Sequence, residues 1–267
     1  MSSNCRDSSI LGDGSICKDR SICRERSICK ESSICEDYLI QNNCLINNDY
    51  CRNAFKYERY FVNYLLANYC MPTLYHVKPS NLIHVDKRKL FDSIVFLRIL
   101  ECELQPFHIG ITILYEDNNM LILLLYYSEL LNFVINCSEK RCFFKRVGYE
   151  VSNNIVLGVI ETLQQRYKEF KEDRKNRMDF DGSQMIVEQT SHKTGHRSDV
   201  LYPHEIGVIL GYPLWDVEDF IRYNGKNYII CGYWKVYHEA DNALKTFYHY
   251  NQLREMGLRS LFTKMNL

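Results

Sequence analysis

Residues 203–237 read PHEIGVILGYPLWDVEDFIRYNGKNYIICGYWKVY, and no other stretch of the chain carries as many structural signals. Pro203 suits the first turn of a helix, where the missing N–H of proline costs nothing. Gly211 is typical of a helix end, and Pro213 prevents that helix from continuing. The stretch therefore predicts a short helix that begins near Pro203 and ends before Gly211.

The second half of the same stretch predicts a helix, a hairpin and a closing helix. Apolar spacing indicates a short helix that starts near Leu214 and is ended by Asn224-Gly225. Runs rich in aromatic and β-branched residues predict strands over 227–231 and 233–237, joined at a glycine, and an amphipathic helix follows over 239–254. The outward face of the first helix is expected to carry three acidic side chains, Asp216, Glu218 and Asp219.

Three side chains of the predicted second strand make a candidate binding face. Alternation along a strand places Tyr233, Lys235 and Tyr237 on one side of it. A lysine between two tyrosines can hold a flat anionic ligand by charge and by stacking. The competing interpretation is an ordinary solvent-exposed strand face.

His204 and Glu205 form a polar pair in the first turn of the predicted helix. A histidine at a helix N-terminus tends to stay neutral, which suits a general base. Glu205 complements the positive end of the helix dipole and is also a candidate ligand-binding side chain. The competing interpretation is that the pair only caps the helix.

The motif H-E-I-G-x-x-L-G-Y-P, followed by G-K-N-Y-x-x-C-G-Y-W-K-V-Y, resembles a family catalogued as domain of unknown function 3793. Upstream, residues 70–74 (CMPTL) and 78–82 (KPSNL) are similar to the C-x-P-T-L and K-P-A-N-L patterns of that family. The resemblance covers roughly residues 55–171 and 201–255. It implies a cytoplasmic bacterial setting, in Clostridia and related Firmicutes, and it carries no assigned activity.

Cys70 and Cys231 lie at the centres of the two motif regions, each next to a predicted turn. We expect the loop 70–82 to pack against the hairpin 231–237, so that both thiols border one pocket with the start of the His204 helix. A thiol there can act as a nucleophile if a nearby cation lowers its pKa, with His204 as the base. The competing interpretation is a small buried hydrophobic residue. Lys78 and Asn81 form a further candidate ligand-binding pair, although an asparagine at this position can also simply anchor the loop.

Composition limits the class of protein. The chain has 267 residues, of which 46% are hydrophobic, and a formal net charge of +0. One medium domain with a real core is expected, and no overall field attracts nucleic acid. The longest apolar run, residues 120–127, is too short to span a bilayer. Twelve cysteines without a secretion signal indicate reduced thiols and a cytoplasmic location.

The first 52 residues differ from the rest of the chain. A six-residue repeat places Ser-Ile-Cys at four successive positions, and the composition predicts a disordered tail. The alternative is a soft-metal or redox tail, although C-x5-C is not the spacing of ordinary zinc sites. Its ligands would be the repeat cysteines Cys17, Cys23, Cys29 and Cys35. We predict no metal site in the chain.

Residues 53–255 are expected to form a single α/β (α+β) domain, with a small mixed or mainly antiparallel sheet covered by helices. A polar linker or insertion is expected over 172–200 and a C-terminal extension over 256–267. Helices are predicted over 55–69, 86–103, 128–136, 138–146 and 151–171, and strands over 107–115 and 120–127, with a further short strand inside 73–85.

Two classes of function remain open. The first is a binding or accessory module for a small anionic ligand or a partner protein, and the second is a thiol-dependent enzyme that uses Cys70 or Cys231. Phosphate-binding glycine loops and the G-x-S-x-G elbow are absent from the sequence, so no cofactor can be assigned. We favour the binding module, because the sequence contains no complete catalytic set.

Overall fold

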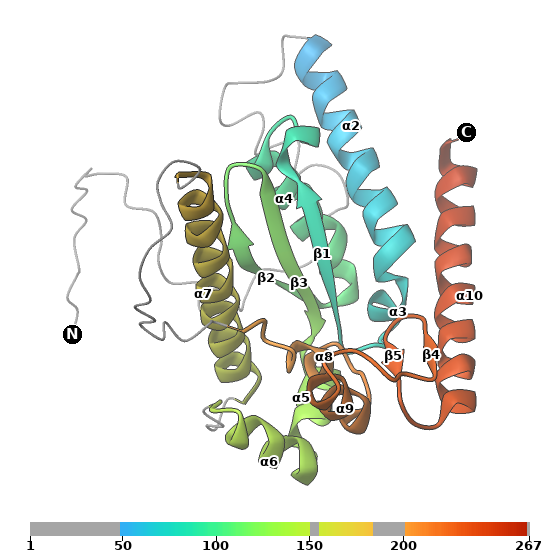
Figure 1. Ribbon diagram of the computed structural model, residues 1–267. Coiled ribbons are helices and arrows are strands. Elements are labelled where there is room, and N and C mark those ends of the chain that lie inside the picture. Colours follow the sequence, from blue (N-terminus) through green and yellow to red (C-terminus); the bar gives the residue numbers. More distant parts are fainter. Residues whose placement is uncertain (1–48, 150–154, 184–200, 266–267) are drawn as a thin grey trace, which may run out of the picture. The chain divides into compact units, whose positions relative to one another are not determined.

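The centre of the fold is a three-stranded antiparallel sheet (Figure 1). The computed structural model describes residues 49–149, 155–183 and 201–265, which belong to one compact unit. The strands are β1 (Ser80–Asp86), β2 (Ile109–Glu116) and β3 (Met120–Tyr127). β3 lies between β1 and β2 and pairs antiparallel with both. This confirms the predicted fold class, a small antiparallel sheet covered by helices.

β3 is buried on both faces, as its continuous apolar sequence predicts. All five side chains from Leu121 to Leu125 have no exposed surface. Leu121, Leu123 and Leu125 belong to one core cluster, whereas Ile122 and Leu124 belong to another on the opposite face. The sheet is therefore the middle layer between two sets of helices.

The first face is covered by α2 (Asp49–Leu65) and α4 (Ser93–Leu104). Asp92 caps α4, because its carboxylate accepts the backbone N–H groups of Ile94 and Val95. Three short elements complete this layer: α3 (Met71–Leu74) and two 3₁₀ turns, η2 (Lys87–Lys89) and η3 (Gln105–Phe107).

The second face is covered by helices that follow β3 in the chain. These are α5 (Ser128–Asn136), α6 (Ser138–Arg146), α7 (Ile155–Ser183) and α8 (Ile206–Ile209). α7 packs along β2, and Figure 1 shows it to the left of the sheet, with α2 and α10 on the right.

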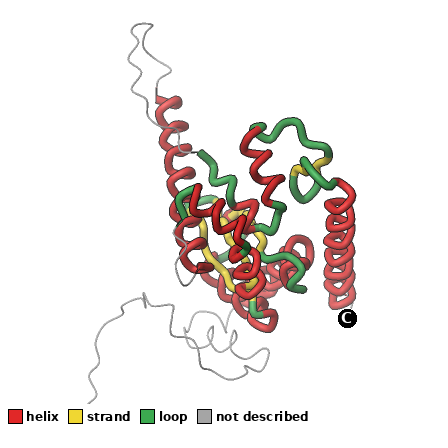
Figure 2. Tube along the Cα trace, turned by 90° about the horizontal axis from the view of Figure 1, so that it is seen from below, coloured by secondary structure: helices red, strands yellow, loops and turns green. Residues whose placement is uncertain are grey.

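The C-terminal part consists of α9 (Leu214–Arg222), a hairpin of β4 (Ile230–Cys231) and β5 (Lys235–Val236), and α10 (Ala240–Met265). Figure 2 shows the short strands of this hairpin between α9 and α10. α10 packs against the π-helical turn η1 (Leu66–Cys70) that follows α2, where the Arg254 guanidinium donates to Asn68 Oδ1 at 2.8 Å.

The first predicted helix does not stop before Pro72. α2 leads into a π-helical turn, η1 (Leu66–Cys70), and then directly into α3, which contains Pro72 in its first turn. Proline is tolerated there because its missing N–H has no partner inside the helix. The residue that precedes proline therefore starts a new helix instead of a loop.

Several other bounds differ from the predicted ones. β1 is seven residues long, and the helix predicted from residue 86 begins only at Ser93, after its Asp92 cap. The two hairpin strands are two residues each, because the pairing does not extend beyond Ile230–Val236 and Cys231–Lys235.

The two long helices exceed their predicted ends, because polar sequence on an exposed helix face gives no stop signal. α7 continues to Ser183 into the predicted linker, and α10 continues through the predicted C-terminal extension to Met265. The rest of the linker, residues 184–200, and nearly all of the predicted tail, residues 1–48, lie outside the described residues.

Candidate functional site

One pocket brings the main sequence motif together. Its volume is about 360 Å³, and it is walled by the segment around α8 and α9 and by the hairpin. It contains four of the predicted site residues, His204, Cys231, Tyr233 and Lys235. The other lining residues are Tyr202, Ile206, Gly207, Leu210, Tyr212, Asp216, Val217, Phe220, Gly232 and Trp234.

Rings form most of the pocket wall. The His204 imidazole lies between Tyr202 and Phe220, with ring centroids 5.1 Å and 5.0 Å away. Tyr212 stacks on Trp234 at 5.2 Å with an interplanar angle of 26°. Such walls favour a ligand with a flat, largely apolar body.

Trp234 is held in place from three directions. Its indole N–H donates to Asp216 Oδ2 at 2.8 Å, and its ring meets the edge of Phe247 on α10 at 4.6 Å. Tyr212 stacks on it as described. Trp234 is thus fixed by two other pocket residues and by Phe247 outside the pocket, which favours a preformed site.

Asp216 of α9 holds the hairpin through hydrogen bonds. It is 2% exposed, and its Oδ1 accepts the backbone N–H groups of Tyr237 at 2.8 Å and His238 at 3.1 Å. Asp219, one turn further along α9, is also buried and bonds the His238 ring and Arg222. The prediction that Asp216 and Asp219 face outward is wrong, because the hairpin packs on that side of α9 and supplies the donors.

The ammonium group of Lys235 lies at the edge of the pocket. Its Nζ donates to the carbonyl oxygen of Gly225 at 2.7 Å and lies 4.8 Å from the ring centroid of Tyr228. It also lies 5.6 Å from the ring centroid of Phe220, a pocket residue. No carboxylate among the described residues pairs with it, so the ammonium can attract an anion in the pocket.

His204 is held in its neutral form by its surroundings. Burial lowers its pKa below the usual value of 6.5, and the neighbouring Glu205 carboxylate opposes that shift only in part. The helix expected from Pro203 begins only at Ile206 and has four residues. Burial, not a helix dipole, therefore keeps the imidazole neutral.

Glu205 does not line the pocket. It is buried, and its Oε1 accepts from Arg166 on α7 at 2.7 Å and from the Tyr149 hydroxyl at 3.1 Å. Tyr237 also lies outside the pocket, with its ring stacked on Tyr223 at 6.0 Å. Both predicted ligand-binding residues instead make contacts that hold elements together.

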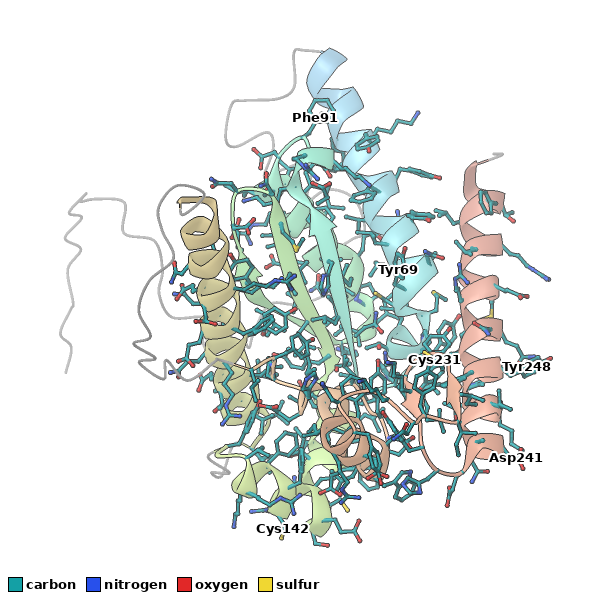
Figure 3. The ribbon with its side chains drawn as sticks, in the orientation of Figure 1. Tyr69, Phe91, Cys142, Cys231, Asp241 and Tyr248 are labelled. Carbon is teal, nitrogen blue, oxygen red and sulfur yellow. The ribbon has the colours of Figure 1, made fainter. Side chains whose placement is uncertain are left out.

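Cys70, Lys78 and Asn81 form a separate buried cluster. Lys78 Nζ donates to Asn81 Oδ1 at 2.9 Å, and Asn81 Nδ2 donates to Cys70 Sγ at 3.7 Å. Cys70 has no exposed surface, and burial raises its pKa to about 12. Cys70 is therefore unsuited to be the reactive thiol, in contrast to Cys231, which is exposed at the pocket (Figure 3).

The two motif regions contact each other, but not through the loop and the hairpin as predicted. A Cβ added at Gly211, which has φ +85°, would lie 2.5 Å from Cδ of Pro79, and the Ser80 hydroxyl donates to the Ile209 carbonyl at 2.7 Å. The upstream loop thus packs on the end of α8, not on the hairpin. The prediction that Cys70 and Cys231 share one cavity does not hold, because only Cys231 lines the pocket.

Tyr212, Trp234 and Asp216 are among the pocket residues that were not predicted from the sequence. The density of aromatic residues in the motif was a usable signal for the first two. Asp216 carried none, since an aspartate in a short amphipathic helix is usually solvated.

A larger groove of about 1100 Å³ runs between α7 and the β2–β3 turn. Its rim mixes basic and acidic side chains in equal number, so its charge favours neither anions nor cations. These are Lys168, Lys171, Arg174 and Lys175, and Glu116, Asp117, Glu161 and Glu172. The smaller aromatic pocket is the better candidate site.

Two global properties complete the description. Within the described ranges, no three histidine, cysteine, aspartate or glutamate side chains gather as a metal site would require. In the same ranges, none of the helices combines the length and apolarity needed to cross a membrane. The repeat cysteines considered as ligands in the tail lie outside these ranges.

Residues 66–267, which include every pocket residue, match the family described as Protein of unknown function (DUF3793). The chain belongs to this family, as its motifs indicated. No match was found among curated proteins or among solved structures.

Proposed function

We propose that the chain is a cytoplasmic binding module that holds a small, flat, anionic ligand in the aromatic pocket. The observation that carries this proposal is the composition of the pocket wall, which places stacked rings beside the Lys235 ammonium. Rings bind the flat body, and the ammonium attracts the acidic group. Cys70, Cys137, Cys142 and Cys231 form no disulfide, which supports a reducing compartment.

The size of the pocket supports a small ligand over a protein segment. Its volume of about 360 Å³ falls at the lower end of the range for small-molecule sites. The neutral His204 imidazole adds a polar group without a negative charge that would repel an anion. Asp216 also lines the pocket, but its oxygens are occupied by Trp234 and by the hairpin backbone.

Filling the pocket is expected to abolish binding. The probe is anilinonaphthalene sulfonate, a flat anionic dye that fluoresces in apolar sites. We expect Cys231→Phe to remove the pocket-bound fluorescence, because the larger ring occupies the space. Titration of the dye into wild-type and variant protein measures this.

Cys142→Phe is the matched control, because Cys142 is also an exposed cysteine but lies on α6, away from the hairpin (Figure 3). This control should bind the dye as the wild type does. If Cys231→Phe and Cys142→Phe both bind the dye as tightly as the wild-type protein does, the pocket is not the binding site and the proposal fails.

A second candidate function is thiol chemistry at Cys231. The observation in its favour is that Cys231 and His204 line one pocket, and that burial keeps the His204 imidazole neutral and able to accept a proton. Cys70 is excluded from this role by its burial and raised pKa. The pocket would then bind the substrate instead of a passive ligand.

Under this second function, Cys231 should react with iodoacetamide at least about tenfold faster than the exposed Cys137 and Cys142. Mass-spectrometric peptide mapping after a brief exposure separates the three thiols from those of the N-terminal region. His204→Phe should bring the rate of Cys231 down to that of the controls. Equal rates in the wild-type protein would leave only the binding function.

A further inference from the structure

Lys78 is a buried lysine directly behind the wall of the pocket. Its side chain is almost completely buried, and its ammonium lies 5.7 Å from the ring centroid of Tyr212. Tyr212 lines the pocket and stacks on Trp234. One aromatic ring therefore touches both the buried cation and the ligand space.

The positive charge of Lys78 has no negative partner in the described part of the chain. Its ammonium donates a hydrogen bond to the neutral Asn81 amide, and no carboxylate in that part of the chain forms an ion pair with it. Cys70 is the nearest acidic group, but burial raises its pKa to about 12 and leaves it an uncharged thiol. A buried charge without a counter-charge is costly, and such charges are usually paired.

We infer that the acidic group of a bound ligand is the counter-charge of Lys78, so that Lys78, together with Lys235, sets the preference of the pocket for anions. This rests on the proposed binding function. Coulomb interactions are strong where little water screens them, and the Tyr212 ring is the main wall between the two charges. Lys78 thus acts on the ligand through Tyr212 and does not touch it.

Protonation supports this coupling. Burial lowers the pKa of Lys78 to about 8, so a part of the protein loses this charge just above neutral pH. A bound anion favours the charged ammonium and raises its pKa. Binding should therefore tighten as the pH falls from about 9 to about 7, with uptake of protons near pH 8.

The other titratable groups around Lys78 do not change charge in that range. Cys70 faces it from η1 and Tyr212 from the segment after α8, with Tyr250 of α10 beyond Tyr212. Burial raises the pKa of each to about 12. In the pocket, the pKa of His204 lies below 6.5, and Lys235 is unchanged in every variant of the test.

The test compares the anionic dye with its uncharged parent, phenylnaphthylamine, on wild-type protein and on Lys78→Met. Methionine keeps the apolar stem and removes the charge. We expect the anionic dye to bind about tenfold more weakly to the variant and the uncharged dye to bind unchanged. Lys168→Met, which removes an exposed lysine of α7, is the control and should change neither dye.

Proton uptake gives a second readout on unaltered protein. The wild-type protein is titrated with the anionic dye near pH 8 in a calorimeter, once in phosphate and once in Tris buffer. The two heats should differ by the number of protons taken up multiplied by the difference between the ionisation enthalpies of the two buffers. This measurement does not depend on the folding of Lys78→Met, and the same titration of Cys231→Ser separates proton uptake by Lys78 from uptake by the pocket thiol.

Three outcomes overturn the inference. Equal weakening of both dyes in Lys78→Met, or identical heats in the two buffers, overturns it and leaves the proposed function standing. Absence of pocket-specific binding by either dye in the wild type, judged against Cys231→Phe, overturns the proposed function and this inference with it.

Discussion

Asp216→Ala is expected to lower the free energy of unfolding by about 3–5 kcal/mol. The buried carboxylate accepts three N–H groups, from the Trp234 indole and from the backbone of Tyr237 and His238. Its removal leaves these donors inside the protein without partners. Urea denaturation followed by circular dichroism measures the loss.

Glu218→Ala is the control on the same helix. Glu218 pairs with Arg146 at the surface, where an ion pair contributes roughly 0–1 kcal/mol. Asp216→Asn should fall between the two, because its amide keeps one acceptor oxygen and turns the other toward the donors as an NH₂ group. A loss below about 1 kcal/mol for Asp216→Ala would show that the hairpin does not depend on this carboxylate.

Glu205→Ala is expected to cost about 3–4 kcal/mol, since it breaks a buried ion pair from one side. The side chain of Glu205 connects α7, through Arg166, with Tyr149 and the turn before α8. Alanine leaves the half-buried guanidinium without its negative partner, with only the Val147 carbonyl as acceptor, and leaves the Tyr149 hydroxyl without its acceptor. Thermal and urea unfolding report this change.

Replacement of both partners separates the ion pair from the packing. The double variant Glu205→Leu with Arg166→Met should recover much of the lost stability, because no uncompensated charge stays buried. A double variant as unstable as the sum of the two single variants would show that the ion pair itself contributes little coupling.

Local sequence patterns were sufficient for the sheet. The continuous apolar run of β3 predicted a strand covered on both faces, and the turn residues between β2 and β3 predicted the hairpin. Patterns of this kind depend on neighbours two to four residues apart, which the sequence shows directly. The missed helix ends at Ser183 and Met265 follow stretches rich in polar residues, which fit a helix as well as a loop.

The candidate site was predictable only where its residues are close in the chain. His204, Cys231, Tyr233 and Lys235 come from one motif of 35 residues, and the structure places them in one pocket. Glu205 and Asp216 were misjudged because their partners are distant or on the far side of a turn. Burial of a carboxylate depends on donors that periodicity does not reveal.

The upstream motif shows the same limit. Its cysteine and lysine suggested a second half of one cavity, but Pro79 packs on Gly211 and places the Tyr212 ring between Lys78 and the pocket. A sequence shows that two segments carry reactive side chains. Which atoms face each other across a packed contact depends on the shape of both segments.

The burial of β3 on both faces has a consequence for protein synthesis. The helices that cover one face, α2 and α4, leave the ribosome before β3, whereas α7 and α8 on the other face follow it. A nascent chain that ends near residue 150 contains α5 and α6 but lacks α7 and α8, so Ile122 and Leu124 lie on a sheet face that is only partly covered. Exposed apolar strands of this kind associate between chains. We expect truncated chains that lack α7 to accumulate as insoluble aggregates during translation in cells, and chaperones that bind apolar strands to associate with the full chain until α7 has docked.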